Sequence, residues 1–161
     1  MRVFPGSFHY FERGTQVIRQ ESYAPSVSVE AAWRDRRANF TLLIDTGTES
    51  TTLFPRQASE LFGNSYGQLD FDDPERRILI GDVGGVLHAA IEEPVDLIFH
   101  DDSDAPLIAS VRILVVRPNP PERLVGSGNW GTPSLLGRDL LLHFDLFVSG
   151  STSEVYLSLP E

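Results

Sequence analysis

The amino-acid sequence predicts an all-β domain, and three observations lead to this prediction. Apolar residues make up 41% of the 161 residues, which is enough to build one core. The 13 Gly and 11 Pro are scattered along the chain, and this suits many short strands and turns better than long helices. Short apolar runs alternate with turn-forming residues, as expected for strands.

The N-terminal part of the chain divides into an extension and the start of the domain. Residues 1–23 mix aromatic and charged side chains without a sustained period, and we interpret them as an edge strand, an arm that packs on a partner, or a loose tail. Residues 24–161 are predicted to form the domain. Its first element is a hairpin, in which residues 26–31 alternate small polar with apolar side chains and residues 40–44 return as the second strand.

The central motif is Asp45-Thr46-Gly47-Thr48, which directly follows the apolar run 40–44. A carboxylate at the end of a buried strand is costly unless hydrogen-bond donors face it. Gly47 frees the backbone to turn and to direct amide groups back at Asp45. The same residues also fit an ordinary Asx-type turn, so their interpretation depends on a second motif nearer the C-terminus.

Between the two motifs, the sequence predicts a short helix, a loop and a hairpin. Residues 56–62 can form about two helical turns. Residues 64–75 are polar and predict a loop. The apolar arms of residues 77–89 flank a tip that carries three glycines. Such a tip fits a plain hairpin, or a mobile cover over a cleft.

The second motif is Leu135-Leu136-Gly137-Arg138-Asp139-Leu140-Leu141. The first two leucines predict a buried strand, and residues 138–143 predict a short helix. Charged side chains inside an apolar segment need specific partners, because an uncompensated charge there is costly. Around this motif, we expect further strands over residues 95–99, 110–116, 144–148 and 154–159, and a long loop over residues 117–132.

The order of these features resembles that of the retropepsin-like aspartic proteases. The matching region runs from residue 25 to residue 144 and contains both motifs with the glycine-tipped hairpin between them. The resemblance implies an acid-protease barrel with a flap hairpin and a short C-terminal helix. It also implies that two chains pair to build one active site. Because the sequence has no second Asp-Thr-Gly or Asp-Ser-Gly, Asp45 must meet Asp45 of a second copy.

The resemblance assigns roles to the residues of the first motif. Asp45 is the catalytic residue. Thr46 joins the two active-site loops through hydroxyl hydrogen bonds, Gly47 allows the tight loop, and Thr48 hydrogen-bonds the outer carboxylate oxygen.

The resemblance also implies a structural brace and a flap. Arg138 is expected to form an ion pair with Glu49, and with Asp139 these residues brace the loop that presents Asp45. The backbone of the flap is expected to grip an extended substrate by strand addition. The flap and substrate-binding residues are Gly81, Asp82, Val83, Gly84 and Gly85.

Together these residues predict an aspartic endopeptidase that acts on extended protein or peptide substrates without metal or other cofactor. One carboxylate deprotonates water and one carboxylic acid polarises the carbonyl group. Two carboxyl groups about 3 Å apart share one proton because they cannot both ionise. A non-catalytic interaction or dimerisation module of the same fold is the alternative, since fold does not fix function. A small-ligand-binding β-barrel has only general all-β support.

Charge and composition argue against other classes of protein. The net charge of −10 repels phosphate backbones, so we expect no nucleic-acid partner. Without Cys the chain has no disulfide, thiolate nucleophile or zinc–thiolate site. We expect a cytoplasmic protein without membrane contact, because no run approaches the length of a membrane span and residues 1–20 lack the apolar region of a signal peptide.

Metal and serine hydrolases are also disfavoured. The four histidines are far apart in sequence, and none lies in a paired ligand motif. No Gly-x-Ser-x-Gly occurs in a strand-to-helix context, so the nucleophile elbow of a serine hydrolase is missing. The histidines, which we interpret as surface or core residues, are His9, His88, His100 and His143.

Overall fold

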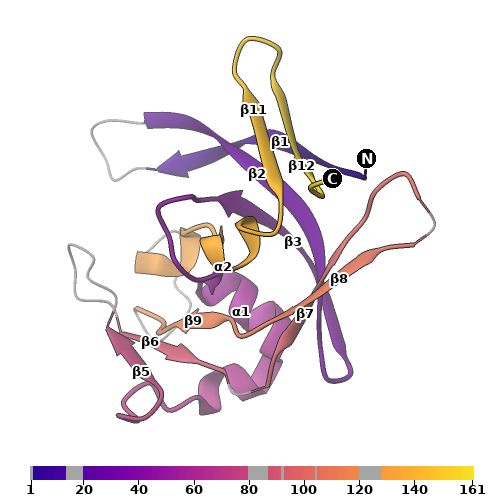
Figure 1. Ribbon diagram of the computed structural model, residues 1–161. Helices are drawn as coiled ribbons and strands as arrows, with labels where there is room; N and C mark the ends of the chain where they lie inside the picture. Colours follow the sequence, from indigo (N-terminus) through magenta and orange to yellow (C-terminus); the bar gives the residue numbers. More distant parts are fainter. Residues whose placement is uncertain (1, 14–19, 80–86, 92, 104, 120–127) are drawn as a thin grey trace.

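The chain is a mainly β protein with one large mixed sheet and little helix, which confirms the predicted β character (Figure 1). The computed structural model describes residues 2–13, 20–79, 87–91, 93–103, 105–119 and 128–161. Its helices are α1 (Pro55–Phe62) and α2 (Arg138–Leu141), with 3-10 turns over Gly63–Gln68 and Gly128–Gly131. The strands are β1 (Val3–Arg13), β2 (Gln20–Trp33), β3 (Arg36–Ile44), β4 (Thr52–Leu53), β5 (Arg77–Leu79), β6 (Leu87–Ala90), β7 (Val95–Phe99), β8 (Leu107–Val111), β9 (Leu114–Val116), β10 (Leu135–Leu136), β11 (Asp145–Ser149) and β12 (Glu154–Ser158).

The strands are joined in the order β11-β12-β1-β2-β3-β10-β4-β9-β6-β5, and β7 pairs with β2 and β8. Most neighbours are antiparallel, but β10 runs parallel to β3 and β4 runs parallel to β9. Among the described strands this path has two ends, β11 and β5, and no pairing closes it into a barrel.

The predicted hairpin is formed by β2 and β3, which pair from Ser26 opposite Leu43 to Trp33 opposite Arg36. Its alternating pattern places every second side chain in the core. Phe40 and Leu42 are almost fully buried, whereas the residue between them, Thr41, is half-buried. The end of β3 is therefore anchored in the core, and the Asp45 motif begins directly after it.

The predicted helix over residues 56–62 is confirmed as α1, which begins one residue earlier at Pro55. Proline suits the first helical turn because the N–H that it lacks would have no partner there. The helix ends at Phe62, and the capping residue that follows, Gly63, has a φ of +55°, which suits glycine. Residues 63–68 continue as a 3-10 helix, so the loop predicted to begin at residue 64 starts later in the structure.

Two other sequence predictions are refined by the structure. The strand predicted over residues 110–116 is divided into β8 and β9, which are separated at Arg112 and Ile113. The N-terminal segment contains a long strand, β1, which pairs with β12 through residues 3–5 and with β2 through residues 6–13. It therefore belongs to the same sheet as the domain.

The start of β1 is held by an ion pair. Arg2 Nε donates to Asp101 Oδ2 at 2.7 Å, and the Asp101 side chain is only 5% exposed. The Arg2 guanidinium and then the Ser103 hydroxyl hold the pKa of Asp101 well below its usual range. Phe4 packs beside this pair in an aromatic cluster with Phe99 and Phe144, at centroid distances of 5.3 to 6.0 Å.

This ion pair predicts a pH dependence of stability. Because the pKa of Asp101 is lower in the folded chain, its contribution is present above the unfolded pKa of about 3.9 and is lost as the pH falls below it. We expect Asp101→Asn to lower the melting temperature at pH 7 and the difference from wild type to shrink towards pH 3. Thermal melts of wild type, Asp101→Asn and the neighbouring exposed-site control Asp102→Asn test this. A difference that is constant from pH 7 to pH 3 would contradict it.

In the part of the chain that the structure describes, no helix is both long and apolar enough to cross a lipid bilayer.

Candidate active site

The Asp45 carboxylate is held by its own loop. The Gly47 N–H donates to Asp45 Oδ1 at 2.9 Å, and the Thr48 hydroxyl donates to Oδ2 at 3.0 Å. The Thr48 N–H also donates to the Asp45 carbonyl at 3.3 Å, which closes the turn. Both carboxylate oxygens therefore have donors, while the residue as a whole stays half-buried and accessible. The expected Thr48 bond to the carboxylate is present.

Gly47 and Thr46 complete the loop at the surface, where both residues are exposed. A Cβ at position 47 would lie 3.2 Å from Asp45 Oδ1, so glycine leaves room for the carboxylate to approach the loop amide. The Thr46 side chain is thus available to a partner, as the resemblance requires, but its role across two chains remains a prediction.

The short strand β10 joins the two sequence motifs. It runs parallel to β3, with Leu136 opposite Ile44, and antiparallel to β4. The Asp45 N–H donates to the Leu136 carbonyl at 3.1 Å, and the Leu43 N–H donates to the Ser134 carbonyl at 2.9 Å. The structure therefore brings the motif around residue 45 and the motif around residue 137 into direct backbone contact.

Asp139 braces the loop through Thr51. The Thr51 N–H donates to Asp139 Oδ2 at 2.8 Å, and its hydroxyl donates to Oδ1 at 2.7 Å. The same hydroxyl accepts the Gly137 N–H at 3.1 Å, and the Leu140 N–H donates to Asp139 Oδ1 at 2.9 Å. The charged side chain that interrupts the apolar motif thus has the specific partners that its position demands.

The predicted ion pair between Arg138 and Glu49 is not formed in the described part of the chain, where both side chains are exposed. Main-chain groups join the same two segments instead. The Arg138 N–H donates to the Thr48 carbonyl and the Asp139 N–H donates to the Glu49 carbonyl, both at 2.9 Å. These bonds need no ion pair, so the guanidinium stays in water, where an ion pair contributes little.

Sequence reasoning missed a buried polar network behind the loop. Ser134, which is fully buried, accepts the Phe54 N–H through its hydroxyl at 2.9 Å. The Gln57 side-chain oxygen accepts the Ser134 N–H at 3.2 Å, and the Gln57 amide donates to the Thr41 carbonyl at 3.3 Å. The network ties α1, β3 and the strand before Gly137 together. No local pattern in the sequence marks Gln57, because its partners are distant in the chain.

We call the Asp45 loop, β10 and the start of α2 the half-site. The predicted flap residues 81–85 lie outside the described residues, and only the arms of their hairpin are described. These arms are β5 and β6, which pair antiparallel from Arg77 opposite Ala89 to Leu79 opposite Leu87. The predicted hairpin is therefore confirmed at its base.

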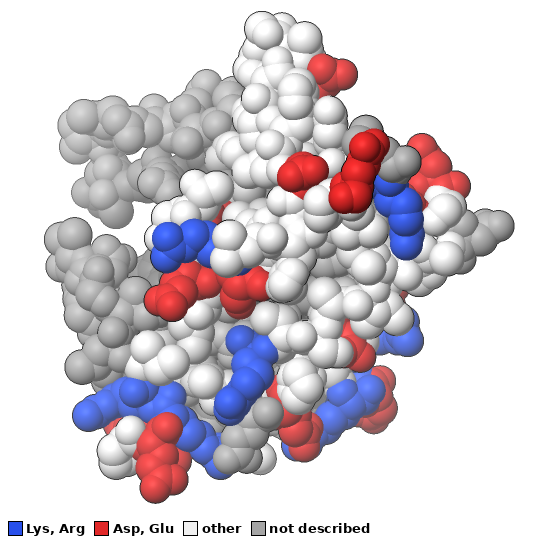
Figure 2. Space-filling model, viewed as in Figure 1, with Lys and Arg blue, Asp and Glu red and all other residues white. Residues whose placement is uncertain are grey.

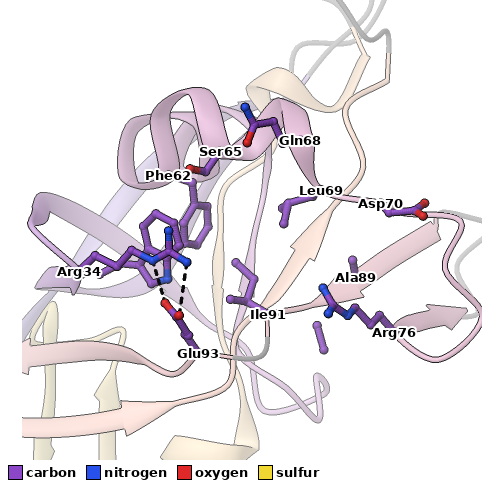
Figure 3. A pocket seen from close by; sticks show the side chains of 12 residues that line it. Arg34, Phe62, Ser65, Gln68, Leu69, Asp70, Arg76, Ala89, Ile91 and Glu93 are labelled. Atoms are coloured by element: carbon purple, nitrogen blue, oxygen red, sulfur yellow. Dashed lines mark hydrogen bonds and ion pairs between the residues drawn. The ribbon is translucent and has the colours of Figure 1, made fainter.

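A pocket lies at the other end of the β2–β3 hairpin (Figure 3). Arg34 stacks on Trp33 with Cζ 4.3 Å from the ring centroid, and its guanidinium bonds Glu93 at 2.8 and 3.3 Å. Phe62 meets Trp33 edge-on at a centroid distance of 4.9 Å. The nine residues of β3 span about 30 Å at ~3.3 Å per residue, so this pocket is remote from Asp45.

No group of three or more His, Cys, Asp or Glu side chains among the described residues is arranged to hold a metal ion. His143 and His100 are exposed, and His88 is 5% exposed. Of His9, the structure describes only the backbone, within β1.

Comparisons with models of protein families, with curated proteins and with solved structures find no match to this chain.

Proposed function

We propose that this chain is one half of a homodimeric aspartic endopeptidase of the retropepsin-like type, with an acid-protease barrel and an active site built from two copies. The observation that carries the proposal is the geometry of Asp45. Its carboxylate ends a core strand, accepts bonds from the Gly47 amide and the Thr48 hydroxyl, and lies on a loop joined to the second motif through β10. A surface turn with no chemical role would not require this connection.

The chemistry follows from two such carboxyl groups facing each other. With a second Asp45 about 3 Å away, one carboxyl group stays protonated and the other is ionised. The ionised group takes a proton from a water molecule, and the protonated group donates to the carbonyl oxygen of the peptide bond. The water oxygen forms a bond to the carbonyl carbon, and the bond from that carbon to the amide nitrogen then breaks. The carboxyl group that took the proton from water gives it to the leaving nitrogen, and a diol hydroxyl returns its proton to the other carboxylate as the carbonyl re-forms, which restores the pair with one proton.

The surroundings of Asp45 support these roles. Donors from Gly47 and Thr48 fix the orientation of the carboxylate plane without the need for a metal ion. Asp139 and Thr51 hold the loop from behind, so the carboxylate is positioned before substrate arrives. The hairpin based on β5 and β6 is the element to which the resemblance gives the role of a flap over an extended substrate.

Digestion of a mixed peptide library tests the proposal. We expect wild type to cut at internal peptide bonds, faster at mildly acid than at alkaline pH because one carboxyl group of the pair must be protonated. Asp45→Asn is expected to lower the cleavage rate by at least about 100-fold, since each proton-transfer group contributes 10²–10⁴. Asp102→Asn, a matched change far from the motif in sequence, is expected to leave the rate unchanged.

The same experiment separates the proposal from the non-catalytic module. Cleavage that persists in Asp45→Asn would point to a contaminating protease or to a different site. The absence of cleavage in a sample that sedimentation shows to be dimeric would favour the interaction module. If the sample is wholly monomeric and cleaves nothing, the chain does not form the proposed homodimer under the conditions of the assay.

A further inference from the structure

We propose that a second copy of this chain docks along β11, by antiparallel pairing of β11 with itself across a two-fold axis centred on Phe147. The choice of a second copy as the partner rests on the two-copy active site proposed above. The exposure, register and charge of the β11–β12 hairpin identify the surface in the single chain.

Strand β11 is unusual because it is exposed on both faces. Leu146 is 36% exposed, Phe147 40% and Val148 44%, although all three are large apolar residues. Beyond the described pairing with β12, the other edge of the strand has no partner among the described strands. The hairpin projects from the body of the molecule (Figure 1). An apolar end strand with open backbone groups is the kind of surface that another strand covers.

The register shows that both faces of β11 extend past the core. Leu146 and Val148 lie opposite Leu157 and Val155. The two β12 residues are buried and the two β11 residues are exposed, so the edge of the core on this face lies between the two strands. On the other face, Phe147 stacks on Tyr156 with ring centroids 4.7 Å apart and an interplanar angle of 15°. Among the described residues of the same chain, none completes either face of β11.

The exposed segment continues directly from the half-site. Leu142, at the end of α2, is 81% exposed and lies three residues after Asp139. From there the chain passes through Phe144, which is anchored among Phe4 and Phe99, into β11. Because this surface follows the half-site so closely along the chain, we infer that a partner that completes the active site also contacts β11.

Charge favours a second copy at this surface. Two copies that each carry a net charge of −10 repel each other over most of their surfaces. Between Phe144 and Ser158 the only charged residues are Asp145 and Glu154. The hairpin surface is correspondingly almost free of colour in Figure 2. Contact here brings few like charges together.

One register is self-complementary. With Phe147 opposite Phe147 of the second copy, Leu146 lies opposite Val148 and the two rings meet on one face. Asp145 then lies opposite Ser149, so no carboxylate faces another or an aromatic ring. A shift of the centre to Leu146 would place Asp145 opposite Phe147 and desolvate its charge, which makes that register unfavourable.

Disulfide trapping tests the surface and its register, because a chain without Cys makes any introduced thiol unique. In Phe147→Cys the two thiols meet across the axis, where paired Cα atoms are about 4.5–5.5 Å apart, within the range of a disulfide. In Asp145→Cys the two Cα atoms are about 13 Å apart, at ~3.3 Å per residue, which is too far. Ile108→Cys probes a different strand with an exposed apolar residue, β8, where Ile108 is 56% exposed.

On non-reducing gels after mild oxidation, we expect at least about tenfold more cross-linked dimer for Phe147→Cys than for either control. Equal trapping of Asp145→Cys and Phe147→Cys would overturn the register, and trapping through Ile108→Cys alone would overturn the surface. A chain that stays monomeric in sedimentation would overturn both.

The outcome for this surface is separable from that for the enzyme. Trapping at Phe147 in a chain that cleaves nothing would support the surface and contradict the proposed function. Cleavage that depends on Asp45, without trapping at Phe147, would support the proposed function and contradict the surface.

Discussion

An equimolar mixture of wild-type and Asp45→Asn chains is expected to keep about a quarter of the activity of wild type at the same total chain concentration. Random exchange of subunits makes mixed dimers twice as abundant as either pure dimer. A mixed dimer has a single Asp45, so it lacks one of the two proton-transfer groups, which costs about 10²–10⁴ in rate. Only the wild-type pairs then contribute.

In the mixing experiment, the cleavage rate is measured as a function of the fraction of wild-type chains. If two copies share one site, activity falls with the square of the wild-type fraction after the chains have exchanged. If each chain had a complete site, activity would fall in proportion, and half would remain. The control mixes wild type with Asp102→Asn and is expected to show no loss. A linear fall with confirmed subunit exchange would contradict the two-copy site.

Replacing Gly137 by alanine is expected to lower the free energy of unfolding by at least about 3 kcal/mol, at the upper end of the cost of overpacking. A Cβ at this position would lie 2.5 Å from the Ser50 carbonyl carbon and 2.7 Å from the Thr51 nitrogen. Both are backbone atoms in the segment that Asp139 braces, so neither can move without breaking the brace. The backbone angles of Gly137, φ −92° and ψ 177°, suit any residue, and the contact alone is responsible.

Thermal or urea unfolding measures this effect, and a second glycine supplies the control. For a chain of this size the expected loss corresponds to a melting temperature lower by roughly 6–12 °C. Gly67 is exposed, and a Cβ there would meet nothing within 4 Å, so Gly67→Ala is expected to be neutral or slightly stabilising. Similar melting temperatures for the two variants would show that the chain relaxes around position 137.

Local sequence patterns were sufficient for the elements around the half-site. Alternation of polar and apolar residues predicts the β2–β3 hairpin, and the order of turn residues after Ile44 predicts the Asp45 loop. The sequence also predicts short helices over residues 56–62 and 138–143, where the structure has α1 and a second helix, α2, that is two residues shorter than predicted. In each case the determining interactions are between residues close in sequence, and so they are visible in one stretch of the chain.

Contacts between distant segments were not predictable in the same way. The exposed Arg138 and the half-buried Asp139 are adjacent charged residues, and their sequence does not say which of them turns inward to Thr51. The Ser134–Gln57 network depends on how α1 packs against β3 and β10. The division of β8 from β9 at Arg112 likewise follows from the strands that each one meets. Such choices are made by tertiary packing rather than by propensity.

The pairing of β1 with β12 also affects when the molecule can assemble. Residues 3–5 complete their ladder only with residues 156–158, which are synthesised after every other strand described here. Contacts so distant in sequence form late, because a long stretch of chain must be ordered first. Residues 6–13 of β1 pair with β2, whereas residues 3–5 complete their ladder only when β12 is present, and the β11–β12 hairpin likewise requires this last described strand. The docking surface proposed above along β11 is therefore among the last parts of the described fold to form.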